Sequence, residues 1–192
     1  MGLTKNNTTG TFLNVSDGKI VRVHKEAVKD VTVLRVTKTG KTVHEEKFST
    51  LTGFIRSMKL HENEFGVQWH VAVEDGSDKF TLTIGENSRY ATSLLKTLPN
   101  IDLEKKVRIM PWSMVDKNDA TKKVTGITCY QGDDIECSVN VVKLAPAYTK
   151  EAPNGLPEMK QVKINGKMAW DSGDMNEFLK QQVELKFTNS PF

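Results

Sequence analysis

The sequence predicts a mainly β fold, in which a five-stranded Greek-key barrel carries one helix between its third and fourth strands. Two observations lead to this prediction. Apolar and polar residues alternate with a period of two along most of the 192 residues, which is typical of half-buried strands. Only Ser88–Leu98 and a stretch near residues 172–183 change to the spacing of a helix. We expect three parts: hairpins over residues 1–50, the barrel over 51–144, and a C-terminal unit over 145–192.

The first fifty residues are expected to form a basic extension of two β-hairpins. Asp17-Gly18 separates two alternating runs and suits a two-residue turn, because both central positions of such a turn need a positive φ. Thr39-Gly40 separates the next two runs, although Thr-Gly is a weaker turn signal. The expected strands are Thr11–Ser16, Lys19–His24, Val31–Lys38 and Lys41–Phe48. This part carries nine basic and five acidic side chains, whereas the whole chain has a formal net charge of only +3.

The central part follows the order strand, strand, strand, helix, strand, strand. The expected elements are strands Leu51–Leu60, Gly66–Asp75 and Lys79–Gly85, helix Ser88–Leu98, and strands Lys105–Trp112 and Lys123–Gln131. Loops are expected at residues 61–65 and 113–122, and Gly53 is expected to relieve crowding where the first strand bends to pair with two neighbours. This order is typical of the OB-fold, a partly open barrel that binds oligonucleotides or oligosaccharides. A different small antiparallel sandwich is the alternative.

The remaining residues extend the predicted barrel. Ile135–Leu144 is expected to be a further strand, and the proline-containing residues 145–158 an extended connector. A hairpin around Asn165-Gly166 and a helix with Met175, Phe178, Leu179 and Val183 on one face are expected to dock on the barrel. Cys129 and Cys137 are expected to be two ordinary buried thiols, with a disulfide across a hairpin as the alternative.

Composition and missing motifs exclude several classes of function. No window approaches the roughly 18 uninterrupted apolar residues of a membrane span, and no apolar segment follows Lys5, so we expect a cytoplasmic protein. The four histidines lack the spacing of metal ligands, and no phosphate-binding loop or catalytic motif is present. His61-Glu62-Asn63-Glu64 is interpreted as a solvated loop. The sequence therefore predicts a binding protein with no enzymatic activity, cofactor or metal.

Alternation divides the central strands into an inner and an outer face. Trp69, Val71 and Val73 are expected inside, whereas Gln68, His70, Thr81 and Thr83 form a polar outer face. Cations and aromatic rings around such a face suit a single nucleic-acid strand, since cations follow phosphates and rings stack on bases. The candidate binding residues are Arg56, Lys59, Phe65, His70, Arg108, Trp112, Lys117, Lys122, Lys123 and Tyr130, with Arg22, Arg35 and Lys41 from the basic hairpins. Ordinary surface lysines and half-buried aromatics are the alternative interpretation.

The run from Leu51 to Gln131, with its basic hairpins in front, resembles the single-stranded DNA-binding proteins encoded by bacteriophages, which build an OB barrel with added hairpins. Pro191-Phe192 resembles the tip of bacterial-type single-stranded DNA-binding proteins, although Lys186–Ser190 lacks the acidic residues of that pattern. The resemblance implies binding without catalysis, in the cytoplasm of a host cell, and contact of the tail with replication or recombination proteins.

The leading hypothesis is a sequence-tolerant protein that binds and protects single-stranded DNA during replication or recombination. An OB-like structural or assembly module of a virion, whose surface contacts protein, is the first alternative. A single-stranded RNA-binding protein is the second, because no residue identifies a contact to a 2′-hydroxyl.

Overall fold

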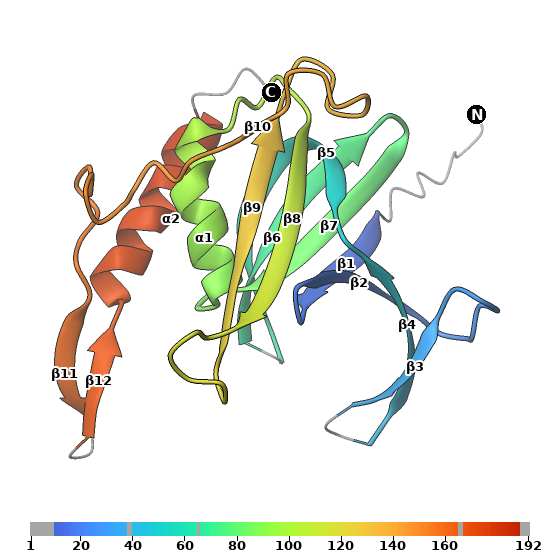
Figure 1. Ribbon diagram of the computed structural model, residues 1–192, viewed down its shortest axis with the longest axis horizontal. Coiled ribbons are helices and arrows are strands. Elements are labelled where there is room, and N and C mark those ends of the chain that lie inside the picture. Colours follow the sequence, from blue (N-terminus) through green and yellow to red (C-terminus); the bar gives the residue numbers. More distant parts are fainter. Residues whose placement is uncertain (1–9, 38–39, 65, 165–166, 189–192) are drawn as a thin grey trace, which may run out of the picture.

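The computed structural model describes residues 10–37, 40–64, 66–164 and 167–188, and within them it confirms the mainly β class. The large sheet has the strand order β10-β9-β8-β5-β6-β7-β1-β2-β4-β3 (Figure 1). Its strands are β1 (Thr11–Ser16), β2 (Lys19–His24), β3 (Val33–Val36), β4 (Thr42–Phe48), β5 (Leu51–Asn63), β6 (Gly66–Asp75), β7 (Asp78–Gly85), β8 (Val107–Val115), β9 (Lys123–Gln131) and β10 (Val142–Lys143). The other elements are a second sheet of β11 (Lys160–Ile164) and β12 (Lys167–Asp171), the helices α1 (Arg89–Thr97) and α2 (Gly173–Thr188), and a 3₁₀ turn at Leu98–Asn100.

The five strands predicted for the barrel are neighbours in the order β9-β8-β5-β6-β7, and α1 lies between the third and the fourth of them in the chain. The sheet is nevertheless not closed into a barrel, which corrects that part of the prediction. The outer edge of β7 pairs in parallel with β1, from Thr11 opposite Phe80 to Asn14 opposite Thr83. On β9, the amide of Ile127 donates to Ser93 Oγ of α1 at 2.6 Å instead of to a closing strand.

The first predicted hairpin has the predicted limits, and its turn contacts α1, β8 and β9. Asp17 and Gly18 both have positive φ, 47° and 74°. The amide of Gly18 donates to Tyr90 Oη of α1 at 2.8 Å, and Asp17 forms an ion pair with Lys123 of β9 at 2.6 Å. A Cβ atom at Gly18 would lie 2.5 Å from the amide nitrogen of Ser113, so the turn packs directly on the backbone of β8.

The core lies between the curled sheet and the two helices. Strands of the sheet contribute buried apolar side chains from alternate positions, among them Leu13, Ile20, Leu51, Ile55, Trp69, Val71, Val73, Leu82, Val107 and Ile109. Ala91, Leu94 and Leu95 of α1 and Met175, Leu179 and Val183 of α2 cover them. Ser88 caps α1 by accepting from the amide of Ala91. The predicted inner faces and the apolar stripe of the last helix are therefore confirmed.

Gly53 has the predicted role. β5 pairs with β8 through Leu51–Gly53 and with β6 from Phe54 onward, so the strand changes partners at this residue. A Cβ atom at Gly53 would lie 2.6 Å from the carbonyl oxygen of Glu74. Only glycine allows so close an approach without displacing the backbone.

Three loop and strand predictions are wrong in detail. Residues 61–63 belong to β5 instead of a loop, because pairing with β6 continues to Asn63 opposite Gly66. β8 likewise continues to Val115. Ile135–Leu144 is not a continuous strand. Its strand part is only Val142–Lys143, next to which the amide of Leu144 donates to the carbonyl oxygen of Cys129 in β9. Before it, Asp134 Oδ1 accepts from the amides of Glu136 and Cys137 and holds these residues in a compact loop.

The two cysteines do not lie together. Cys129 is buried in β9 and Cys137 is exposed on the loop, and both are free thiols. The expectation of two buried thiols is thus confirmed for Cys129 and wrong for Cys137. The compact loop explains the difference, because it carries Cys137 away from a direct cross-strand position.

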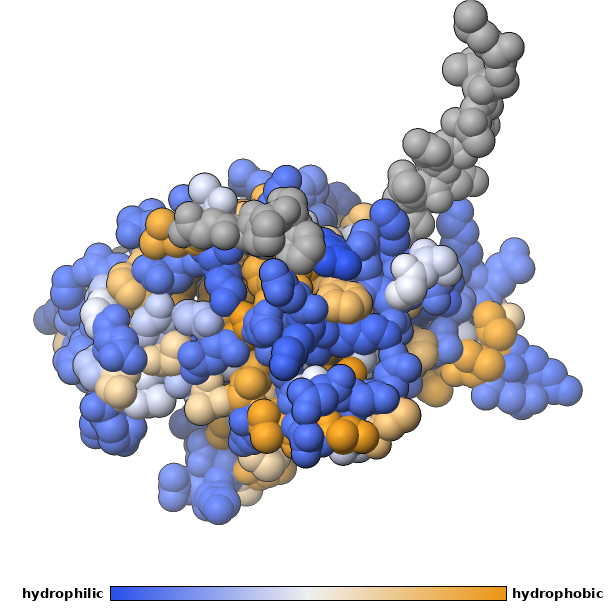
Figure 2. Space-filling view, turned by 90° about the horizontal axis from the view of Figure 1, so that it is seen from above, coloured by the Kyte–Doolittle hydropathy of each residue, from blue (hydrophilic) through white to orange (hydrophobic). Residues whose placement is uncertain are grey.

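The second predicted hairpin forms an arm at one end of the sheet, seen on the right of Figure 1. β2 pairs with β4 and β4 with β3, the edge strand. All four residues of β3 are exposed, and apolar side chains gather at this end of the molecule in the space-filling view (Figure 2). Within the described residues, no helix has the length and apolar composition needed to cross a membrane.

Candidate nucleic-acid interface

Three aromatic rings lie in a row across the outer face of β1, β6 and β5. Phe12 of β1 is 57% exposed and meets the ring of His70 on β6 edge to face, with centroids 6.0 Å apart. The ring of His61 on β5 lies 4.6 Å from that of His70 at an interplanar angle of 32°. We call Phe12, His70 and His61 the ring row.

Local pairing explains why these rings meet. Alternation along β6 sends Trp69 and Val71 into the core and His70 outward, as the sequence predicts. Phe12 joins them only because β1 runs parallel to β7, with Thr83 Oγ1 donating to the carbonyl oxygen of Leu13 at 2.6 Å. The row therefore combines three strands that only this sheet order brings together.

Burial favours the neutral form of one imidazole of the ring row, and an exposed cation lies beside that ring. Desolvation lowers the pKa of His70, and the charge of His61 lowers it further. Lys59 lies directly opposite His70 in the β5–β6 ladder, is exposed, and has no ion pair with another described residue. Gln68 and Thr81, which the sequence also placed on this face, are half-buried neighbours. The face can therefore hydrogen-bond and stack without carrying a high charge.

A second aromatic surface lies on the outer face of β8 and β9. Trp112 stands opposite Gly126 in the ladder, and its ring lies against that glycine, since a Cβ there would be 2.6 Å from Cζ2. Tyr130 stands opposite Arg108. Both rings are half-buried, and Trp112 and Tyr130 are therefore less accessible to a stacked base than Phe12.

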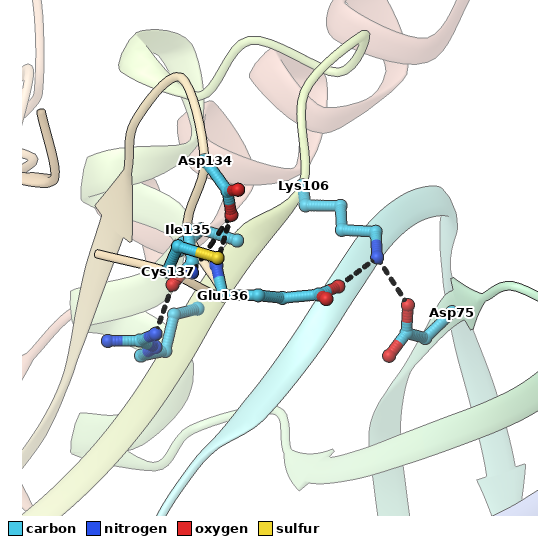
Figure 3. A network of polar contacts seen from close by, with 7 residues as sticks. Asp75, Lys106, Asp134, Ile135, Glu136 and Cys137 are labelled. Atoms are coloured by element: carbon cyan, nitrogen blue, oxygen red, sulfur yellow. Dashed lines mark hydrogen bonds and ion pairs between the residues drawn. The ribbon is translucent and has the colours of Figure 1, made fainter. Parts of the chain in front are cut away.

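Arg108 is held by the protein itself. Its guanidinium donates to the carbonyl oxygen of Ile135 in the loop after β9. In the same region Lys106 lies between Asp75 and Glu136 (Figure 3), and these two carboxylates raise its pKa. This network fastens the loop to the β6–β7 turn, which indicates a structural role for Arg108.

Several other predicted phosphate-binding cations have carboxylate partners in the chain. Arg56 pairs with Glu74 at 3.0 Å and lies over the ring of Phe54. Lys122 pairs with Asp119 at 2.9 Å, and Lys123 with Asp17. The hydrogen bond and charge of Asp17 raise the pKa of Lys123. These exposed pairs are weak, but each lowers the positive potential offered to a phosphate.

The predicted residues therefore do not form one continuous site. Lys59 and His70 lie together on the outer face. Arg22 lies in β2 of the first hairpin, opposite Glu46, whereas Arg35 and Lys41 belong to the arm, where Arg35 pairs with Glu45. Lys117 is exposed in the β8–β9 connection. Phe65 and Pro191-Phe192 lie outside the described residues.

Phe12 and His61 were missed as binding residues by the sequence reasoning. The alternation of Thr11–Ser16 placed Phe12 on the opposite face from Leu13, but no sequence signal identified β7 as the parallel partner of that strand. The sequence predicts a loop at His61. Extending the strand to Asn63 is not enough to place His61 beside His70, because alternation from the buried Ile55 would turn His61 inward; the β-bulge between Ile55 and Ser57 reverses the faces and turns it outward.

Comparison with known proteins gives no relative for this arrangement. No family model, curated protein or solved structure matches the chain. Among the described residues, no group of three or more histidine, cysteine or acidic side chains could hold a metal ion.

Proposed function

We propose that the protein binds single-stranded DNA, with little sequence preference, on the outer face of β5, β6, β7 and β1, and that it protects the strand during replication or recombination. The ring row carries this proposal. It combines an exposed Phe12 with two imidazoles on an open sheet face, and Lys59 stands beside it without an ion pair to a described residue.

The chemistry of this face suits unpaired bases. Every base has a π-face, so stacking tolerates any sequence and contributes about 1–3 kcal/mol per base. Lys59 supplies a cation for the phosphates, and Gln68 and Thr81 supply hydrogen-bonding groups that do not repel them. A duplex keeps its bases stacked inside, so the same face offers it only the weak electrostatic contribution.

The strand order supports a relation to the OB-fold as part of this proposal. The run β9-β8-β5-β6-β7 follows the OB neighbour order, with the barrel opened by β1. In OB-folds the second and third strands and the loop after the first strand bind the ligand. His70 of the ring row lies on the second strand of the predicted barrel, β6, and His61 and Lys59 lie near the end of β5, whereas Phe12 comes from the added strand β1.

The proposal is tested by fluorescence anisotropy with labelled oligonucleotides of about 20 nucleotides. We expect tighter binding to single-stranded DNA than to duplex, and affinity that falls as salt rises. Single-stranded RNA of the same sequence tests the RNA alternative. Phe12→Ala should weaken binding about 5- to 150-fold, the loss of one stacked base. Leu185→Ala, an exposed apolar residue of α2, is the control. Absence of binding at low salt, or an unchanged Phe12→Ala variant, would contradict the proposal.

The arm favours a second candidate function, contact with protein, as in a virion assembly module. Val33, Leu34 and Val36 of the edge strand β3 are exposed, and open strand edges are ready templates for pairing with another chain. Sedimentation of the protein alone tests contact between copies. A concentration-dependent oligomer that Leu34→Lys disrupts would support this candidate, and a monomer at all concentrations would count against it.

A further inference from the structure

The β11–β12 hairpin presents an apolar surface that the ring row does not explain. It forms a sheet of its own beside α2, at the end of the molecule opposite the arm (Figure 1). In its ladder Gln161 pairs with Trp170 and Lys163 with Met168, so these four side chains share one face. We call these four residues the hairpin face.

The hairpin face is exposed although it carries large apolar groups. Trp170 is 64% exposed, the highest value among the exposed large hydrophobic side chains of the described residues, and Met168 is 62% exposed, as is Val36 of the arm. Val162 and Ala169, on the opposite side of the same hairpin, are half-buried. Lys160 on that side pairs with Asp174 of α2, which ties the hairpin to the helix. The hairpin thus turns Trp170 outward while its other side meets the protein.

We propose that the hairpin face is a second contact for the single strand, with a base stacked on Trp170; this inference rests on the proposed function. The face carries one cation, Lys163, and no carboxylate, so its charge is complementary to a phosphate backbone. Tryptophan supplies a large flat ring, and ring stacking on bases is the usual contact of sequence-tolerant proteins. The flexible Met168 side chain packs beside either face of such a base.

The position of the hairpin suits a strand that also crosses the ring row. In Figure 1 the hairpins β11–β12, β8–β9 and β5–β6 all extend toward the lower edge of the molecule. The β8–β9 connection carries the exposed Lys117, and the end of β5 carries His61 of the ring row. On the proposed path, a strand that leaves the ring row along this edge runs past the β8–β9 connection to the β11–β12 hairpin, where Trp170 lies on β12 close to the start of α2. Only an oligonucleotide longer than the ring row itself can make both contacts.

Oligonucleotide length therefore separates the two contacts. Binding is measured by anisotropy with oligonucleotides of about 8 and about 24 nucleotides. Trp170→Ala should weaken binding of the longer one about 5- to 150-fold and leave the shorter one unchanged. Trp170→Phe keeps a ring and should retain most of the affinity. It should also abolish much of the tryptophan quenching seen on binding, because Trp69 is buried and Trp112 half-buried. Leu185→Ala is again the control, and thermal unfolding confirms that the variants fold.

The outcomes distinguish this inference from the proposed function. If the wild type binds both oligonucleotides and Trp170→Ala binds each of them with the affinity of the wild type, the hairpin contact is refuted and the proposed function stands. Equal weakening of both lengths by Trp170→Ala also refutes it, since the short strand would then not be confined to the ring row. If the wild type binds neither length at low salt, the proposed function itself fails.

Discussion

Replacement of Gly18 tests whether the turn of the first hairpin holds the sheet in its curled form. Gly18→Ala places a Cβ 2.5 Å from the amide nitrogen of Ser113 and 2.9 Å from the carbonyl carbon of Trp112, both backbone atoms that no rotamer change can move. Alanine at the φ of 74° costs about 1–2 kcal/mol, and the overpacking about 1–3 kcal/mol more. We expect a loss of about 2–5 kcal/mol in the free energy of unfolding. For a chain of this size that lowers Tm by about 4–20 °C.

Gly76→Ala is the matched control, because Gly76 has a φ of 59° but no atom within 4 Å of its Cβ position. It should cost only the conformational part, about 1–2 kcal/mol. Calorimetry or circular dichroism gives both Tm values, and equal losses in the two variants would refute the close packing of the turn on β8. Tyr90→Phe removes the acceptor of the Gly18 amide at 2.8 Å and should cost about 1–3 kcal/mol by leaving that amide unpaired.

Further predictions concern charge and thiol chemistry. Because folding lowers the pKa of His70, the unfolded chain binds the proton at a higher pH than the folded chain does. The free energy of unfolding should therefore fall as the pH drops below about 6.5. Urea titrations at pH 7.5 and 5 measure this loss, and the His70→Gln variant should not show it. Lys117→Ala should flatten the salt dependence of DNA binding by about one phosphate contact, and Lys122→Ala by less, because Asp119 already pairs with Lys122. Brief iodoacetamide treatment followed by mass spectrometry should modify Cys137 alone. Asp134 raises the pKa of Cys137, but this thiol is exposed, whereas Cys129 is buried and burial raises its pKa to about 12.

Local features of the fold were predictable from the sequence. The Asp17-Gly18 turn, the limits of β6 and β9 and the apolar stripe of α2 follow from patterns within a few residues, and the structure reproduces them. Gly53 was predictable for the same reason, since a long strand with an internal glycine suggests a change of partner.

Long-range pairing was not predictable. Alternation specifies which face of a strand is buried, but it does not specify which strand is the neighbour, so the parallel pairing of β1 with β7 had no signal. The prediction of the candidate site was affected most, because Phe12 joins the ring row only through the pairing of β1 with β7. Ion pairs such as that of Lys123 with Asp17 were also not predictable, because they join residues that are distant in the chain.

The pairing of β1 with β7 also bears on the order in which the chain can assemble. Leu13 and Thr83, which it joins, are separated by 70 positions, whereas the β1–β2 and β6–β7 hairpins need only local contacts. Closing so long a loop is entropically costly and slow, so the first hairpin to be synthesised must wait for β7 before it has a partner. Until then the edge of β1 and the ring of Phe12 are open to other chains, and a rapid supply of β6–β7 protects the nascent protein from aggregation.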